Sequence, residues 1–324
     1  MKNILEAIEN SNWSDNTKKQ RIQVLNFIKK DLEIDENGFD FLKDSKLIEK
    51  YILNKYKNPN TIFSKLVCVK NCLALIDKRM AAKYDTLANK LTEKITEHKD
   101  NNVVDAEKLL SANEMIEIPY KIGSEIKDIY GRIFLIDVEI TELKTKKNVY
   151  KYMRYLTDYI ISVFYFWQAP VRAEFGIMEL KKSDVNNWYD SKTKTVHYND
   201  FKNVKSFGKR SFILDNNVAN ELNKYIKVLN YIIKDPKRII YMFNTNNYNE
   251  FTRSSFCSYF HNMIKRYTGK NLTINNIRHS FETNTMNNTN YNKLTIGQKR
   301  AIHERLLHRW TTAAEYQQIE REED

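Results

Sequence analysis

The sequence predicts a mainly α-helical protein of two domains, with one small antiparallel β-sheet in the second domain. Three observations support this fold. Only 7 glycines and 4 prolines occur in 324 residues, so few tight turns interrupt the chain. Apolar residues recur at helical spacing over long stretches, whereas one short region carries two β-rich runs. The length exceeds what a single domain usually holds.

Residues 1–98 are predicted to form a helical domain. Ser14 is a suitable N-cap for a first helix. One broad face of that helix would carry Ile22, Leu25, Phe27 and Ile28. A second helix begins at Asn58-Pro59, because proline in a first turn loses no hydrogen bond. Its apolar positions are Ile62, Leu66, Val69, Leu73 and Ile76. Lysines and arginines fill many other positions, as a solvated face or a DNA-facing surface would.

The polar run at residues 98–102 interrupts the apolar periodicity, so we place a linker at 99–105 and the second domain at 106–324. Helical patterns cover residues 111–118 and 148–167, and Pro170 forces the chain out of the latter. Two β-rich runs, joined by a basic stretch, predict a hairpin with strands within 195–201 and 211–214. Further helices are predicted over 217–233, 252–267, 274–286 and 295–308.

The composition favours a polyanionic partner. With 53 Lys+Arg against 41 Asp+Glu, the net charge is +12, which suits nucleic acid or anionic lipid, and charge alone does not choose between them. The most apolar run, residues 155–167, is too short to span a membrane and contains Asp158. The first residues do not read as a signal peptide. Three cysteines give neither a disulfide framework nor zinc spacing, so we expect a reduced, intracellular protein. We expect no association with a membrane.

Two segments near the carboxyl end carry chemistry together. Asn276-Ile277-Arg278-His279-Ser280-Phe281 comes first, and Leu306-Leu307-His308-Arg309-Trp310 leads on to Tyr316. A capping box at Thr312-x-x-Glu315 places Tyr316 near the first turn of a terminal helix. A phenol needs positive neighbours or a base to act as a nucleophile near neutral pH. A tyrosine shortly after a histidine, with a phosphate-binding arginine upstream, meets the needs of DNA cleavage through a phosphotyrosine bond.

These segments resemble the tyrosine recombinase (phage-type integrase) family. The resemblance covers the C-terminal two-thirds, and the first hundred residues resemble the family's core-binding domain. The family site contains an arginine, a hairpin lysine, a His-x-x-Arg pair, a histidine or tryptophan, and the tyrosine. Matched residue by residue, it implies Arg172, Lys202, Asn275, Arg278, His308 and Tyr316. Lys205 and Lys209 are alternatives to Lys202, and His303 is the alternative to His308.

The chain departs from the family pattern at four places. Glu174 follows Arg172 by two residues rather than three, and Asn275 stands where the family usually has histidine. Leu307 replaces the usual glycine before His308, and Tyr316 follows that histidine by eight residues rather than nine. An amide at 275 can still donate to a phosphate but exchanges a proton less readily, so the departure at Asn275 puts an acid–base role there in doubt.

Each site residue also has an ordinary structural interpretation. Arg172 would pair with Glu174 or another acid, Arg278 with an acid such as Glu282 on a helix surface, and His308 would meet the last carbonyls of a helix. Lys202 and its two rivals would belong to a solvated basic turn, and most tyrosines in a chain with 20 of them are structural.

The resemblance implies an enzyme that breaks and rejoins double-stranded DNA without metal or nucleotide cofactor. It would act as a homotetramer on DNA, in integration or site-specific recombination of a virus or other mobile element. Three alternatives stay open: a type IB topoisomerase, a catalytically impaired DNA-binding relative, and a basic helical scaffold with chance matches.

Overall fold

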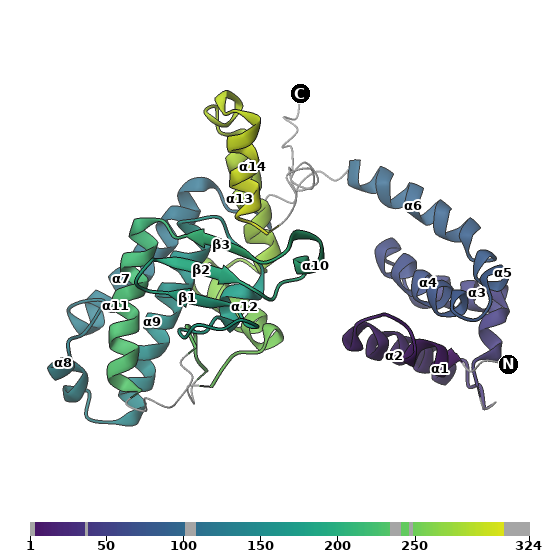
Figure 1. Ribbon diagram of the computed structural model, residues 1–324, viewed down its shortest axis with the longest axis horizontal. Coiled ribbons are helices and arrows are strands. Elements are labelled where there is room, and N and C mark those ends of the chain that lie inside the picture. Colours follow the sequence, from purple (N-terminus) through teal and green to yellow (C-terminus); the bar gives the residue numbers. More distant parts are fainter. Residues whose placement is uncertain (1–3, 36–37, 101–107, 234–240, 246–248, 308–324) are drawn as a thin grey trace. The chain divides into compact units, whose positions relative to one another are not determined.

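The computed structural model describes residues 4–35, 38–100, 108–233, 241–245 and 249–307 (Figure 1). The chain divides into two compact units, residues 1–102 and 103–324. Most of the described residues are helical, and one three-stranded antiparallel sheet lies in the second unit. The predicted fold class, mainly α with a small antiparallel sheet, is therefore confirmed.

The first unit is a group of helices packed around α4. Its elements are α1 (Ile4–Glu9), α2 (Asp15–Asp31), η1 (Asp40–Lys43), α3 (Ser45–Lys55), α4 (Pro59–Ala74), α5 (Lys78–Ala82) and α6 (Asp85–Asp100). The predicted cap is confirmed, since Ser14 accepts from the Thr17 backbone N–H. The predicted start of α4 is confirmed too, and there the Asn58 side chain accepts from backbone N–H groups. Helix α6 continues to Asp100, and most of the predicted linker lies outside the described residues.

The predicted core of this unit needs one correction. Leu25 and Ile28 are buried on α2, but Phe27 is 54% exposed. Each helical residue turns the chain by about 100°, so a position two after Leu25 points away from the stripe that Leu25 and Ile28 share. The Lys55 ammonium instead lies 5.5 Å from the centre of the Phe27 ring.

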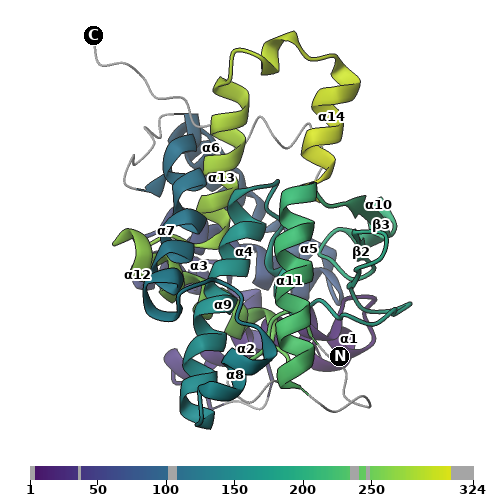
Figure 2. The ribbon, with the colours of Figure 1, turned by 90° about the vertical axis from the view of Figure 1, so that its left-hand side faces the viewer.

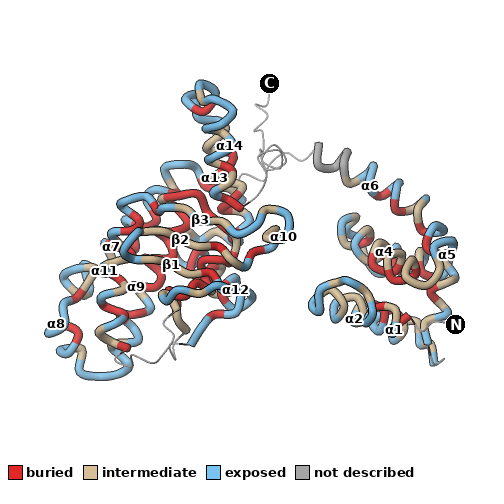
Figure 3. Tube along the Cα trace, viewed as in Figure 1, coloured by how far each residue is buried: buried red, intermediate tan, exposed pale blue. Residues whose placement is uncertain are grey.

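The second unit is organised around α9 (Lys146–Phe166), which is buried along most of its second half (Figure 3). Helices α7 (Ala112–Tyr130) and α11 (Asn216–Ile232) pack against it from two sides (Figure 2). The remaining helical elements are α8 (Asp137–Glu142), η3 (Ala173–Ile177), α10 (Val204–Phe207), α12 (Arg253–Thr268), α13 (Ile274–Asn287), η4 (Tyr291–Lys293) and α14 (Ile296–Glu304).

The predicted hairpin is confirmed and gains a third strand. Strands β2 (Thr195–Tyr198) and β3 (Arg210–Ile213) pair antiparallel, and β1 (Trp188–Asp190) pairs with the other edge of β2. Trp188 stands opposite His197, and their rings stack with centroids 3.9 Å apart. A strand of three residues shows too little alternation to be found from sequence.

Gly176 has no side chain, which allows η3 to lie directly against α12. A Cβ built on Gly176 would come within 2.1 Å of the Phe256 ring, so no side chain fits there. This close approach fixes the segment that follows Arg172, the residue immediately before η3.

Candidate active site

Arg278 ties three distant segments together. It lies in α13, which begins with a capping box between Thr273 and Asn276. Although charged, Arg278 is only 1% exposed. Its Nη1 donates to the carbonyl of Pro170, at 2.9 Å, and to that of Leu306, at 3.0 Å. Burying a guanidinium is unfavourable unless hydrogen bonds replace its water, and these carbonyls do so at Nη1. Arg278 is therefore not the helix-surface residue of the ordinary interpretation.

Arg172 follows Pro170 by two residues and immediately precedes η3. It is half-buried. The Tyr165 hydroxyl donates to the Arg172 carbonyl, so this turn is held from α9 as well. Burial, followed by the charge of Glu174, raises the pKa of Tyr165 and that of Tyr198 well above the usual value for a phenol. Glu174 itself is 4% exposed. Its carboxyl thus belongs to the buried surroundings of these two tyrosines, which do not ionise at neutral pH.

The three candidate lysines lie in the connection between β2 and β3. Lys209 donates to the Asp184 carbonyl at 2.6 Å. Lys202 and Lys205 are exposed, the first in the turn after β2 and the second on α10. An exposed ammonium on a hairpin connection can reach bound DNA, whereas Lys209 would first have to leave a backbone carbonyl. This contrast favours Lys202 or Lys205 over Lys209.

Asn275 is exposed in the first turn of α13, three residues before Arg278. Residues three apart lie on neighbouring positions of a helix face. The positive end of the helix dipole also favours an anion near the first turn. The amide of Asn275 is therefore placed to donate to a phosphate that approaches this end of α13.

A buried cluster that the sequence did not reveal joins α13 to α14. Glu282 and His303 are both fully buried, and the His303 Nδ1 lies 2.8 Å from a carboxylate oxygen of Glu282. On the other side of the ring, the Tyr291 hydroxyl lies 2.7 Å from Nε2. Burial and the charge of Glu282 raise the pKa of Tyr291. His303 thus has a structural role in holding α14, which the spacing of histidines alone could not distinguish from a catalytic one.

We expect Glu282→Ala to destabilise the fold strongly, because it leaves His303 without this buried partner and opens a cavity. Breaking a buried pair from one side lowers the free energy of unfolding by about 3 to 5 kcal/mol. Urea denaturation followed by circular dichroism measures the change. Glu304→Ala, on the less buried part of α14, is the matched control and should change stability little. An equal effect of the two substitutions would show that the buried contact contributes nothing.

The described chain stops one residue short of His308. His308, Tyr316 and the box at 312–315 lie outside the described residues. Leu306, which binds Arg278, is buried, and so is Leu307. The Leu307 backbone has φ of 57°, a left-handed conformation that glycine adopts without steric cost. A residue with a side chain pays roughly 1 to 2 kcal/mol there. Leu307, which stands where the family pattern has glycine, therefore keeps the left-handed backbone conformation that glycine favours.

Comparisons with known proteins give one fold-level finding. No family model matches the chain, and no curated protein matches it. Among solved structures, it is similar to the crystal structure of XerA recombinase, with 16% sequence identity and a TM-score of 0.42. The match covers 98% of this chain and 92% of the other.

Two further observations concern membranes and metals. Within the described ranges, no helix is long and apolar enough to cross a bilayer. Among the same residues, no group of three or more histidines, cysteines, aspartates or glutamates is arranged to hold a metal ion.

Proposed function

We propose that this protein is a tyrosine recombinase that cleaves and rejoins DNA strands through a covalent 3′-phosphotyrosyl intermediate. The supporting observation is the position of Arg278, held between the carbonyls of Pro170 and Leu306. It brings together the turn that leads to Arg172, the helix that carries Asn275, and the segment that continues to His308. Arg172 and Asn275 thus belong to segments that meet at the buried Arg278 guanidinium, and His308 follows Leu306 by two residues in the sequence.

In the proposed reaction, the Tyr316 hydroxyl gives up its proton to water, and its oxygen attacks a backbone phosphorus of bound DNA. The new bond is a 3′-phosphotyrosyl ester, and the bond from phosphorus to the 5′ oxygen breaks. Lys202 supplies the proton that the departing 5′ oxygen takes up. Arg172 and Arg278 donate to the non-bridging oxygens, where charge grows in the five-coordinate transition state, and Asn275 and His308 add hydrogen bonds. Attack by a 5′ hydroxyl of another duplex reverses the step and joins new ends.

The fixed orientation of Arg278 is what makes this arrangement effective. Donors that are already positioned before the reaction stabilise a transition state without reorganising when charge develops. Because the Arg278 side chain is only 1% exposed, the chain around it has to open when DNA binds, before the chemical step, so that the donor is in position when charge develops. DNA binding and opening of the site are therefore coupled in this proposal.

A nicked suicide substrate tests the proposed function. The short strand 3′ to the cleavage point diffuses away after cleavage, so the covalent protein–DNA adduct accumulates and shifts on a denaturing gel. We expect the adduct with a duplex that carries the recognised sequence. DNA binding without an adduct on any of a set of candidate sites would indicate the catalytically impaired relative. Relaxation of supercoiled plasmid by substoichiometric protein, without sequence preference, would indicate a topoisomerase.

The role of Lys202 has a separate chemical test. We expect Lys202→Ala to slow cleavage roughly 100-fold, the lower range for loss of a general acid. A substrate with sulfur in place of the bridging 5′ oxygen should restore the rate, because a thiolate leaves without being protonated. Lys205→Ala is the matched control, since Lys205 is also exposed in the same connection. Rescue of Lys205→Ala instead of Lys202→Ala would move the assignment to Lys205.

A further inference from the structure

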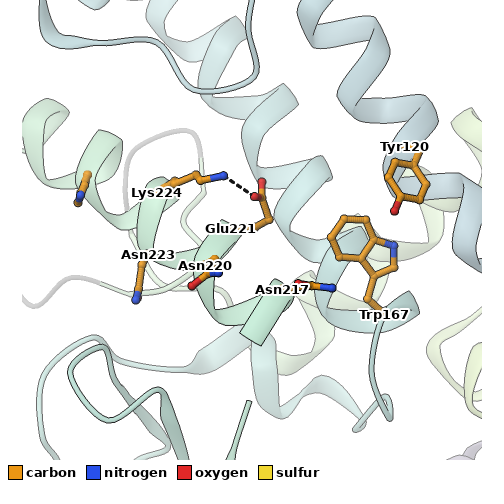
Figure 4. A pocket seen from close by; sticks show the side chains of 8 residues that line it. Tyr120, Trp167, Asn217, Asn220, Glu221, Asn223 and Lys224 are labelled. Atoms are coloured by element: carbon orange, nitrogen blue, oxygen red, sulfur yellow. Dashed lines mark hydrogen bonds and ion pairs between the residues drawn. The ribbon is translucent and has the colours of Figure 1, made fainter. Parts of the chain in front are cut away.

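A polar hollow on the second unit is lined by none of the residues whose hydrogen bonds hold Arg278. Its volume is about 500 Å³, within the range of small-molecule sites. Helix α11 forms one wall, and residues from α7 and the end of α9 form the other (Figure 4). The lining residues are Tyr120, Trp167, Asn217, Asn220, Glu221, Asn223, Lys224 and Lys227.

Two aromatic rings make the apolar wall. The Tyr120 and Trp167 rings have centroids 5.3 Å apart and are tilted by 46°. Tyr120 is 64% exposed, so much of its ring faces water rather than the core. The indole N–H of Trp167 lies 3.5 Å from the carbonyl of Ile116 on α7, which helps to set the orientation of the ring. The tilted pair exposes aromatic ring faces, chiefly that of Tyr120, on which another aromatic group can stack.

Asparagine amides make the opposite wall. Asn217, Asn220 and Asn223 recur every three residues, so they lie along one side of α11. Asparagine is a weak helix former, and three in one helix lower its intrinsic stability. Asn223 is already engaged, accepting from the Tyr189 hydroxyl at 3.1 Å. The amide of Asn217 points toward Trp167 (Figure 4), so a ring stacked on that indole would place its polar edge near this amide.

The charged residues leave the hollow with a positive balance. Glu221 accepts from the Tyr159 hydroxyl at 2.9 Å and from Lys224 at 2.6 Å. Its carboxylate is thus satisfied by neighbours within the protein. Lys227 adds a second ammonium one turn along α11 from Asn223. Two lysines against one glutamate favour a ligand that carries negative charge.

We propose that this hollow binds a nucleotide. The base stacks on the Tyr120–Trp167 pair, and its polar edge meets Asn217 and Asn220. Its phosphate lies toward Lys227 and toward Lys224, which turns from Glu221 to meet it. A saccharide would use the rings and amides but not the ammonium groups. The bases of an intact duplex have no free face to stack, so the ligand is either a free nucleotide or an unpaired nucleotide in a strand. This proposal requires no phosphotyrosine chemistry.

Equilibrium binding to the full-length chain tests the proposal. The probes are a fluorescein-labelled single-stranded oligonucleotide, the same strand in a duplex, and dAMP as competitor. We expect Tyr120→Ala and Asn217→Ala each to weaken single-strand binding about tenfold, since one stacked base contributes on the order of 1 to 3 kcal/mol. Duplex binding should stay unchanged. Tyr150→Ala on α9 and Asn230→Ala on α11 are matched controls, because both residues are exposed and neither lines the hollow.

The competitor distinguishes the two sources of the ligand. If dAMP displaces the oligonucleotide from wild-type protein, with weaker displacement in the two variants, the hollow takes a free nucleotide. If only the oligonucleotide responds to the substitutions, it takes an unpaired nucleotide in a strand. Wild-type binding by Tyr120→Ala and Asn217→Ala, or equal losses for single strand and duplex, would overturn the proposal. Adduct formation on duplex DNA should persist in Tyr120→Ala, so the two proposals can fail separately.

Discussion

Replacing Tyr316 with phenylalanine is expected to abolish the covalent adduct while leaving DNA binding intact. The substitution removes one oxygen atom, and that oxygen is the proposed nucleophile. Loss of a nucleophile lowers the rate by roughly 10⁴-fold or more, because no other group takes its place. The adduct on a nicked suicide substrate is the readout, and duplex affinity measured alongside it reports on folding and binding.

A matched tyrosine makes this result interpretable. Tyr150 is exposed on α9, so Tyr150→Phe should form adduct at the wild-type rate. An adduct that persists in Tyr316→Phe would rule out this residue as the nucleophile. Peptide mapping of the DNA-linked fragment would then show which of the remaining tyrosines carries the phosphate.

Replacing Arg278 with lysine is expected to slow cleavage by about 100- to 1000-fold, the effect of losing one preorganised donor to a developing charge. Lysine keeps the positive charge but not the planar fork that binds two phosphate oxygens. It also cannot reproduce the geometry with which Nη1 serves the carbonyls of Pro170 and Leu306. One unsatisfied buried carbonyl lowers the free energy of unfolding by roughly 1 to 3 kcal/mol.

Single-turnover cleavage, measured well below the unfolding temperature of the variant, separates the two effects. Arg305→Lys is the control, because Arg305 lies close in the chain to Leu306 and forms a more exposed ion pair with Asp215 at 3.1 Å. We expect its cleavage rate to change less than threefold, in keeping with the small contribution of surface pairs. A wild-type rate for Arg278→Lys would mean that this side chain serves the fold alone.

The sequence predicted the fold well where the signal is local. Helix starts at Ser14, Asn58 and Thr295 were predicted, and in the structure each of these side chains accepts from a backbone N–H group of its helix. The hairpin was found because β-rich runs flank a basic connection. Strand β1 was missed because three residues are too few to show an alternating pattern. The exposure of Phe27 was missed because a broad apolar face does not show which of its residues lies at the edge and faces solvent.

The candidate site is a different matter, because it depends on contacts between residues far apart in the chain. The order of the motifs pointed to Arg172 and Arg278. It could not show that the Arg278 guanidinium would bind the carbonyls of both Pro170 and Leu306. Nor could it show that His303 meets Glu282 and Tyr291 in a closed cluster. The roles of His308 and Tyr316 stay predictions, and the adduct assay with Tyr316→Phe tests the role of the tyrosine.

The proposed double use of Arg278, in the fold and in cleavage, also bears on how descendants of such a chain would evolve. A lineage that lost its nucleophile would still need this guanidinium to keep the Pro170 turn attached to the end of α14. Selection for a stable fold would therefore preserve the arginine long after strand breakage had ceased. Among distant homologues, retention of this arginine would be a poor marker of activity, whereas retention of the tyrosine would be informative.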